Sequence, residues 1–379
     1  MRMTDRLHTL TLHGDRTNSL ITCYADWQVY TAPTQGFVSY QDTPGARVAA
    51  SEPLAPHDMR AQLLAEFALQ TPQRTCVLPI GAQLASELRA FGFTTWQVGA
   101  EPIFDLALCF LRHPQPGGHL AKHPMARTLA TRGAQVDEIP WRDLAPSATP
   151  GLRDELDEMV SAWSTSKACP PLEYLSATRP FELLEHKRFF LLRVRGEATA
   201  FLSAAPYYND KAEVQGYYLA DVLRWPTARA GAVDLLTLET MRLLHAEGCP
   251  EVRLGMAPLA RLNDDAPALL RWLYEHWTLG YGFKSLAQYK AKLRPSRWEP
   301  MYMASTGGSL VTALLDVLRV HFPGGLFRTG LEILGQRIGA PLELTPAAAS
   351  RFGPGETLLP RSLRDYLWKT RVTSLMVDV

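Results

Sequence analysis

Two successive stretches of this chain repeat one order of elements: paired strands, then a helix, then a further strand. In the first stretch, the strand-like residues 36–40 and 47–50 flank a Pro44-Gly45 turn and predict a hairpin. The second stretch has three predicted strands followed by a helix, at residues 189–194, 198–205, 213–220 and 232–246. This alternation predicts an α/β (α+β) fold made of two similar units.

The other predicted elements fill in the same plan. In the first half they are strands at 20–30, 75–80, 94–98 and 103–110 and helices at 58–69, 82–91 and 120–131. In the second half they are helices at 152–164, 181–186 and 266–277 and a strand at 251–254. Residues 140–150 are rich in Pro and Ala and predict a boundary. The expected domains are therefore 1–140, 141–305 and a helical C-terminal extension, 306–379.

The extension contains two amphipathic segments, 310–320 and 326–338, joined at Pro323-Gly324-Gly325, with a last short helix near 363–369. Two interpretations stay open. The pair packs as a helical hairpin on the core or in a dimer interface, or it lies on a membrane surface. Residues 309–338 are thus the candidate segment for a peripheral membrane contact.

Composition excludes several classes of protein. The net charge of the 379 residues is +1, so a charged partner must be met by a local patch. The five cysteines form no C-x-x-C pair, which argues against a zinc site or a disulfide framework and fits a reducing cytoplasm. The first residues lack a signal-peptide pattern, and no window has the ~20 apolar residues of a membrane span. We therefore expect a cytoplasmic protein, at most peripheral at the inner face of the cell membrane, and no metal site.

One stretch, residues 281–304, mixes cations with aromatic rings. The cations are Lys284, Lys290, Lys292, Arg294 and Arg297, and no acidic residue comes before Glu299. The aromatic residues are Tyr281, Phe283, Tyr289, Trp298 and Tyr302. Such a mixture favours a phosphate-bearing partner whose bases or acyl tail stack on the rings.

The order of strands and helix around residues 216–236 resembles the fold of acyl-CoA-dependent N-acetyltransferases (the GNAT fold). In that fold a glycine-rich loop before the helix binds pyrophosphate through backbone amides. Here Ala228 stands at the Gln/Arg position of the motif, and Gly231 is the one glycine present. The resemblance therefore implies tandem GNAT-like units that do not use CoA, and no cofactor is expected.

A longer set of motifs resembles the C-terminal catalytic domain of the aminoacyl-phosphatidylglycerol synthases (lysyl- and alanyl-phosphatidylglycerol synthases). In chain order the pieces are Asp221-Val-Leu-Arg224, Gly231-Ala-Val-Asp234, Leu254-Gly-Met-Ala-Pro-Leu259, Tyr281-Gly-Phe283, Tyr289-Lys-Ala-Lys292-Leu-Arg-Pro295 and Trp298-Glu-Pro300-Met-Tyr302. Fainter matches are Gly36-Phe-Val-Ser-Tyr40, Ser51-Glu-Pro53 and Gly99-Ala-Glu101. The resemblance spans about residues 20–305.

The resemblance implies an aminoacyltransferase with aminoacyl-tRNA as donor and phosphatidylglycerol or a related polar phospholipid as acceptor. Two alternatives stay open. The acceptor is a non-lipid molecule such as a peptide, a cell-wall precursor or a small molecule, or the chain is a non-catalytic binding module with the GNAT shape. Met301, which replaces the arginine of the family motif, keeps the second alternative open.

The candidate catalytic residues are Asp221, Arg224 and Lys292, expected to converge in one cleft. Asp221 would orient the acceptor or the α-ammonium of the amino acid, Arg224 would hold a phosphate, and Lys292 would bind a tRNA phosphate or stabilise the leaving oxygen. The candidate substrate-binding residues are Asp234, Gly255, Met256, Tyr281, Lys290, Arg294 and Trp298.

Several of these residues also have a purely structural interpretation. Asp221 and Arg224 could pair with each other at a strand end. Lys290 and Lys292 could face solvent, and Trp298 could anchor the core. Gly255 could simply shape the exit from a strand.

Overall fold

A computed structural model describes residues 1–322 except 32–35, 112–114, 116, 147–150, 168–171 and 277–281. Met1–Pro323 forms one compact unit, and Gly324–Val379 forms a second that lies outside the described residues. The predicted helices at 326–338 and 363–369 fall in that second unit. Tyr281 also lies outside the described residues.

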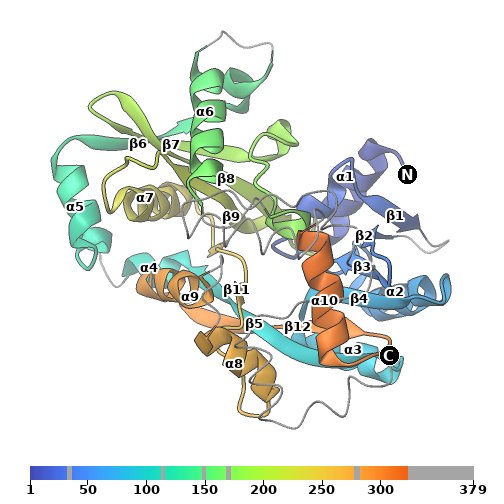
Figure 1. Ribbon diagram of the computed structural model, residues 1–379. Coiled ribbons are helices and arrows are strands. Elements are labelled where there is room, and N and C mark those ends of the chain that lie inside the picture. Colours follow the sequence, from blue (N-terminus) through green and yellow to red (C-terminus); the bar gives the residue numbers. More distant parts are fainter. Residues whose placement is uncertain are drawn as a thin grey trace, which may run out of the picture. The chain divides into compact units, whose positions relative to one another are not determined.

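A mixed sheet of 12 strands runs through the described unit (Figure 1). The elements of the first half are α1 (Met3–His13), β1 (Gln28–Thr31), β2 (Phe37–Asp42), β3 (Ala46–Ala50), α2 (Arg60–Leu69), β4 (Arg74–Gly81), α3 (Ala82–Ala90), β5 (Thr94–Asp105), α4 (Leu106–Leu111) and α5 (Pro124–Thr131). The chain thus opens with a helix that the sequence analysis did not predict.

The second half repeats the plan. Its elements are β6 (Ala134–Ile139), α6 (Leu152–Thr165), β7 (Arg188–Val194), β8 (Glu197–Tyr208), β9 (Val214–Arg224), α7 (Ala232–Ala246), β10 (Glu251–Arg253), β11 (Ala257–Pro258), α8 (Ala268–His276), α9 (Phe283–Lys292) and β12 (Arg297–Ser305), followed by α10 (Leu310–His321). In each half a strand crosses through a helix to a parallel neighbour: β3 through α2 to β4, and β9 through α7 to β10.

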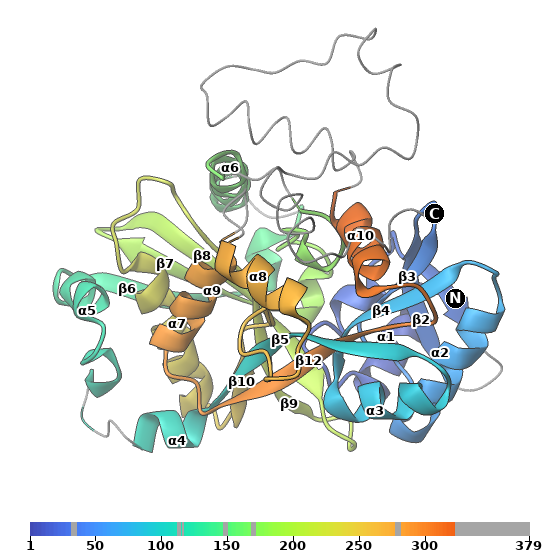
Figure 2. The same ribbon diagram turned by 60° about the horizontal axis from the view of Figure 1, so that its bottom comes forward.

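The two halves exchange their last strands at the centre of the sheet. The strand order is β1-β2-β3-β4-β12-β5-β10-β9-β8-β7-β6. β12 of the second half is antiparallel to β4, β5 of the first half is antiparallel to β10, and the two pair with each other (Figure 2). Residues from both halves are therefore brought together at this centre. The domain bounds at 140 and 305 stay a prediction, and β6, which ends at Ile139, already pairs with β7.

Helix α7 shows how the second half is held together. Its apolar residues, with Leu235, Leu236, Met241 and Leu244 among them, pack on the face of the sheet formed by β7, β8 and β9. The other face of these strands is covered by α6, through Leu156 and Met159. Burial of side chains of this size stabilises the fold by roughly 1.5–3 kcal/mol each.

Most of the predicted elements are confirmed, and with them the mixed α/β class. The hairpin at 36–50 is β2 and β3, and the predicted helix at 232–246 has the bounds of α7. Several predictions were wrong in part. Of residues 181–186 only Leu184–His186 is helical, as a 3₁₀ turn, and the strand predicted at 213–220 continues to Arg224. Residues 94–105 form one strand, and the chain then turns into α4, so the predicted strand at 103–110 ends early. Residues 20–30 hold a 3₁₀ turn, Ile21–Cys23, before β1.

Helix α10 begins at the predicted position and packs on the core. Ala313, Val317 and Val320 are buried against β3 and β4, and the buried Asp316 accepts a hydrogen bond of 2.7 Å from Arg74. This packing confirms the core interpretation for α10; the second helix of the predicted hairpin lies outside the described residues. No helix in the described ranges is long and apolar enough to cross a membrane.

Candidate functional site

The parallel strands β9 and β10 pair over three residues only and then separate. The last pair is Tyr218 with Arg253. β9 continues to Arg224, whereas the chain after Arg253 leaves through Leu254–Leu259, the LGMAPL motif. We call this place the β9–β10 divergence. The strongest sequence motifs lie around it.

Lys290 of α9 holds the segment that leaves β10. Its ammonium donates hydrogen bonds of 2.8 Å to the carbonyl of Gly255 and 3.0 Å to that of Met256. The side chain is buried, and burial lowers the pKa of Lys290 to about 8. Lys290 therefore satisfies two carbonyls that no longer take part in a strand ladder, and it is not the solvent-facing or phosphate-facing cation that we expected.

Gly255 sits at the sharpest point of this exit. Its φ is +74°, a conformation that side chains rarely adopt, and an added Cβ would lie 3.0 Å from the ring of Tyr218. Met256 packs beside it against Gly99 of β5. Both residues thus line the divergence. Gly255 shapes it because its positive φ lets the chain turn away from β10 close to the ring of Tyr218.

Asp221 lies on β9 three residues past the last pair with β10. Its Oδ2 accepts a hydrogen bond of 2.7 Å from the hydroxyl of Ser203 on β8. Burial raises the pKa of Asp221, and the nearby ammonium of Lys187 counteracts the rise. Lys187 is itself buried, donates 2.9 Å hydrogen bonds to the Tyr24 hydroxyl and the Arg179 carbonyl, and has its pKa lowered by burial to about 8. We call Asp221, Ser203, Lys187 and Tyr24 the Asp221 cluster.

Arg224 lies on the opposite face of β9 from Asp221. Side chains alternate along a strand, and no bulge interrupts residues 221–224 in their pairing with β8. Leu223, two residues after Asp221, packs toward α6, whereas Val222 packs toward α7. Arg224 instead donates hydrogen bonds of 3.1–3.3 Å to the carbonyls of Trp225, Pro226 and Ala228. The structural alternative in which Asp221 and Arg224 pair with each other is therefore wrong.

Lys292 forms an ion pair with Asp234 in the first turn of α7. The Asp234 carboxylate is buried, whereas the Lys292 side chain is 50% exposed. His123, buried beside the pair at the start of α5, has its pKa lowered by burial, and its Nδ1 has no hydrogen-bond partner among the described residues. Arg294, exposed just after α9, lies near His123 as well. We call Asp234, Lys292, His123 and Arg294 the Lys292 cluster.

The three predicted catalytic residues therefore do not converge on one point. Lys292 and Arg224 lie on the α7 side of the sheet and Asp221 lies on the α6 side. Both clusters adjoin the β9–β10 divergence. Asp221 lies on β9 just past the last pair with β10. The Lys292 cluster is close because α9 binds the segment after β10 through Lys290 and the first turn of α7 through Lys292. The expectation of one cleft with three converging side chains is corrected to two clusters on opposite faces.

A third group of buried charges, which the sequence analysis did not assign, lies where the halves meet. Glu101 of β5 accepts a hydrogen bond of 2.6 Å from Thr17 and lies 3.6 Å from the guanidinium of Arg253. Burial raises the pKa of Glu101, and Arg253 and then Lys290 oppose the rise. The weak Gly99-Ala-Glu101 match was the signal for this group in the sequence; Ser203 and Lys187 belong to no motif.

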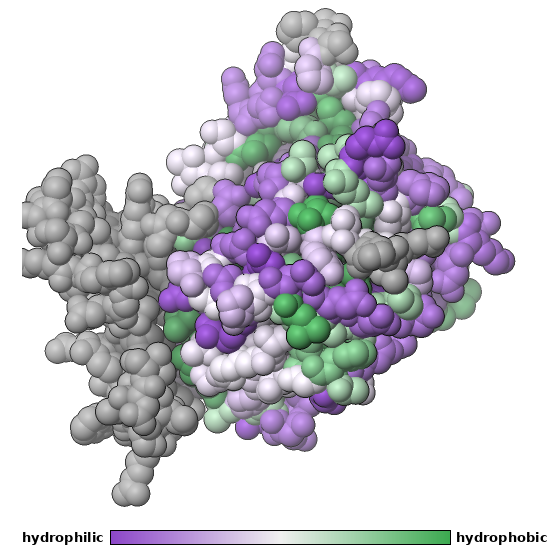
Figure 3. Space-filling view, turned by 90° about the vertical axis from the view of Figure 1, so that its right-hand side faces the viewer, coloured by the Kyte–Doolittle hydropathy of each residue, from purple (hydrophilic) through white to green (hydrophobic). Residues whose placement is uncertain are grey.

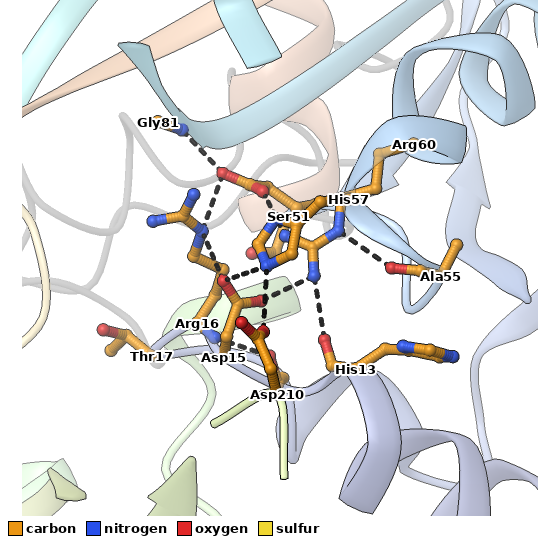
Figure 4. A network of polar contacts seen from close by, with 12 residues as sticks. His13, Asp15, Arg16, Thr17, Ser51, Ala55, His57, Arg60, Gly81 and Asp210 are labelled. Atoms are coloured by element: carbon orange, nitrogen blue, oxygen red, sulfur yellow. Dashed lines mark hydrogen bonds and ion pairs between the residues drawn. The ribbon is translucent and has the colours of Figure 1, made fainter. Parts of the chain in front are cut away.

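A network in the first half fixes the segment that carries Thr17 (Figure 4). Arg60, almost fully buried, binds Glu52 at 2.8 Å and Asp15 at 2.6 Å. Arg16 lies between the same two carboxylates, 3.0 Å from Glu52 and 3.5 Å from Asp15. The Ser51-Glu-Pro53 motif thus contributes a structural carboxylate rather than a substrate contact.

Trp298 is a core anchor. It packs on Ala257, Ala260 and Ala287, and the guanidinium of Arg261 lies 4.7 Å from the centre of its ring. The described ranges contain no group of three His, Cys, Asp or Glu side chains able to hold a metal ion. The groups described around the β9–β10 divergence are charged side chains, hydroxyls and backbone carbonyls.

Comparisons of sequence connect this chain with known proteins. A phosphatidylglycerol lysyltransferase of Bacillus subtilis is 25% identical over 223 residues, which are 56% of this chain and 24% of the relative. One from Staphylococcus aureus is 31% identical over 132 residues, 33% of this chain and 15% of the relative. The chain thus matches less than a quarter of the length of these relatives.

Two solved structures share the fold. One is the C-terminal domain of a putative lysylphosphatidylglycerol synthetase from Agrobacterium fabrum, with a TM-score of 0.69, 22% identity and coverage of 86% of this chain and 98% of that domain. The other is L-PGS from Bacillus licheniformis, with a TM-score of 0.67, 17% identity and coverage of 84% and 96%. A model of the family described as "Phosphatidylglycerol lysyltransferase, C-terminal" matches residues 8–305. The chain therefore belongs to the phosphatidylglycerol lysyltransferase C-terminal family.

Proposed function

We propose that this protein transfers an aminoacyl group from aminoacyl-tRNA to a hydroxyl of phosphatidylglycerol or a related polar phospholipid. The observation that carries the proposal is the position of the Asp221 and Lys292 clusters on opposite faces of the β9–β10 divergence. Family membership and the names of the relatives support the choice of substrates.

The proposed reaction is a transesterification. The oxygen of the lipid hydroxyl attacks the carbonyl carbon of the aminoacyl ester, a new C–O bond forms, and the bond to the ribose oxygen breaks. The hydroxyl proton passes to that ribose oxygen. Because the ester is already activated, most of the rate enhancement must come from the orientation and proximity of the two reacting groups.

Asp221 is suited to hold a hydroxyl or an α-ammonium group at the reacting centre. Its Oδ2 is fixed by Ser203, and Lys187 and Tyr24 lie behind it. A carboxylate held in this way gives a charge-assisted hydrogen bond with little loss of side-chain entropy. In our proposal Asp221 orients one reacting group, and its raised pKa brings the carboxylate nearer to the basicity useful for accepting a proton.

The Lys292 cluster is suited to a phosphodiester. Lys292 is half exposed and pairs with Asp234 in the first turn of α7, and the exposed Arg294 lies near His123 beside that pair. Cations close to a helix start favour an anionic group. Both proposed substrates contain phosphodiesters, so this cluster is where we propose that one of them is held.

The test is a transfer assay with the full chain, tRNA charged with a radiolabelled amino acid, and vesicles of phosphatidylglycerol. The proposal expects label in the chloroform-extractable phase, abolished by RNase. Label that enters only the aqueous phase identifies a non-lipid acceptor and contradicts the lipid assignment. No transfer with any charged tRNA, together with retained ligand binding, identifies the non-catalytic binding module.

A further inference from the structure

A strip of short helical segments packs alongside α7. It consists of α4 and residues 117–131, which include the 3₁₀ turn Gly118–Leu120 and α5. We call it the α4–α5 strip, and Figure 1 shows both of its helices on the same side of the ribbon as α7. The chain of the strip contacts α7 from its C-terminal end to its N-terminal end. Phe110 stacks on His245 near the end of α7, His119 bonds to Glu239 in the middle, and Met125 contacts Gly231 just before the first turn. One side of the strip is therefore occupied by α7.

The strip also exposes large apolar side chains. Leu108 is 45% exposed, Leu111 is 75% exposed and Met125 is 55% exposed. Neighbouring apolar residues of the strip, such as Leu106, Leu120 and Leu129, are buried against α7 and the sheet. On the face shown in Figure 3, by contrast, hydrophobic residues lie singly or in small groups among hydrophilic ones. Exposed apolar side chains that gather on one segment mark an interaction surface.

The same strip is cationic. From Leu106 to Val136 the sequence contains no Asp or Glu. Lys122, Arg127 and Arg132 are exposed, and within the described ranges the structure gives their side chains no hydrogen bond or ion pair. Of the α7 carboxylates near the strip, Glu239 is bound to His119 and Arg242, and Asp234 is paired with Lys292. The strip thus offers free positive charge beside exposed leucine and methionine.

We propose that the α4–α5 strip is the surface by which this protein docks on a bilayer with anionic headgroups. Apolar side chains enter the boundary between headgroups and acyl chains, and Lys or Arg beside them are attracted to anionic lipid. Water-soluble acidic partners would use the cations but leave Leu108 and Leu111 without a function. A bilayer uses both.

The inference concerns docking and rests on the proposed function only where it names the reacting lipid. Met125 of the strip lies against Gly231, the residue before α7, and Asp234 in the first turn of α7 pairs with Lys292. A bilayer on this strip therefore lies beside the Lys292 cluster. On this assignment the phosphodiester held by Lys292 and Arg294 is that of the lipid, and the aminoacyl ester meets Asp221.

The experiment measures co-sedimentation of the full chain with vesicles of phosphatidylglycerol and of phosphatidylcholine. Leu108→Glu/Leu111→Glu is expected to lower partitioning onto phosphatidylglycerol vesicles about tenfold or more, since two apolar anchors become anions. The matched control is Leu69→Glu on α2, an equally apolar side chain that is 84% exposed in the first half, and it is expected to bind as the unmodified chain does. Circular dichroism checks that all variants are folded.

A second arm tests the charge. Lys122→Glu/Arg127→Glu is expected to weaken binding to phosphatidylglycerol vesicles several-fold, and added salt is expected to reduce the difference. If only this pair matters and the leucine pair has no effect, the strip binds an acidic partner rather than a bilayer, and the proposal is overturned. It is also overturned if the control Leu69→Glu weakens binding as much as the leucine pair does.

Transfer assays separate this inference from the proposed function. With acceptor lipid in detergent micelles the leucine pair should retain transfer, and with vesicles it should lose it. If the unmodified chain transfers nothing in either form, the proposed function fails, while sedimentation still decides whether the strip binds vesicles. Unchanged sedimentation of the leucine pair refutes the docking surface even if transfer is found.

Discussion

The α6 face and the α7 face of the second-half sheet each carry an aspartate near a lysine. On the α6 face the lysine is buried, and on the α7 face it is half exposed. On the α6 face, Asp221 is fixed by Ser203 and lies near Lys187, whose ammonium has three hydrogen-bond acceptors and is buried. On the α7 face, the carboxylate of Asp234 is buried but its partner, Lys292, is half exposed. One face holds a carboxylate in a fixed position, and the other presents a cation to solvent.

This difference suggests a division of labour. Asp221 is a half-buried carboxylate with fixed partners, and such a group suits a role in orientation, where small displacements matter. A half-exposed cation is cheap to keep and suits the recruitment of a charged group from solvent. The following predictions break or sharpen the comparison, beginning with the largest expected effect.

Asp221→Asn should have the largest effect on transfer. It keeps the size of the side chain but removes its charge, so kcat/KM should fall about 100-fold, equivalent to ~2.7 kcal/mol of transition-state stabilisation. Ser203→Ala, which removes only the hydroxyl that fixes the carboxylate, should reduce kcat/KM less than tenfold. Transfer rates of both variants with charged tRNA check the order, and near-normal activity of Asp221→Asn would remove Asp221 from the mechanism.

Lys290→Met should affect stability rather than recognition. The variant leaves the carbonyls of Gly255 and Met256 without their donor, and an unsatisfied buried polar group costs about 1–3 kcal/mol. Lys284→Met serves as the matched control on the same helix, because both members of the Lys284–Glu275 ion pair are about half exposed and the pair should contribute about 0.5 kcal/mol or less. Urea unfolding measures both free energies. Equal losses for the two lysines would contradict the buried role assigned to Lys290.

Lys292→Ala should lower kcat/KM for transfer about tenfold, or ~1.4 kcal/mol. The expected cause is a lost contact with a phosphodiester, so the loss should lie mainly in KM and should shrink at high salt. The control is Asp234→Asn, which removes the partner but keeps the cation. If Lys292→Ala has unchanged kinetics, the α7 face does not bind a substrate.

Lys187→Met should shift the pH dependence more than the maximal rate. The ammonium of Lys187 lowers the pKa of Asp221, so its loss should raise that pKa further. If the carboxylate form of Asp221 is the active one, the acid limb of kcat/KM moves to higher pH in the variant. In the unmodified chain Lys187, whose pKa is about 8, should also add a change in rate near that pH, which the variant lacks. Superimposable profiles would show that the two groups are uncoupled.

Features fixed by local pattern were predicted well from the sequence. The bounds of α7 follow from helical spacing of its apolar residues and from the glycines that flank it, and both lie within one segment of chain. The hairpin β2–β3 likewise depends on a Pro-Gly turn between strand-like residues. The LGMAPL motif and the Tyr289–Trp298 stretch lie around the β9–β10 divergence, where we propose the site.

The faces of Asp221 and Arg224 were misjudged because the strand was predicted to end at Ala220. In a strand that continues to Arg224, residues three apart point to opposite sides. The length of β9 depends on its pairing with β8, which is a long-range interaction. A local pattern therefore could not decide whether these two side chains meet.

By itself, the sequence determined which segments are strands and helices, and it identified the charged residues that gather near the end of the second half. Tertiary structure alone decided which of those charges are buried. Lys290 and Lys292 stand two residues apart in the same helix, yet one is enclosed among backbone carbonyls and the other reaches solvent. The reason is physical: burial depends on which distant segments pack on a helix, and here the segment that leaves β10 and continues into β11 packs on α9 at Lys290.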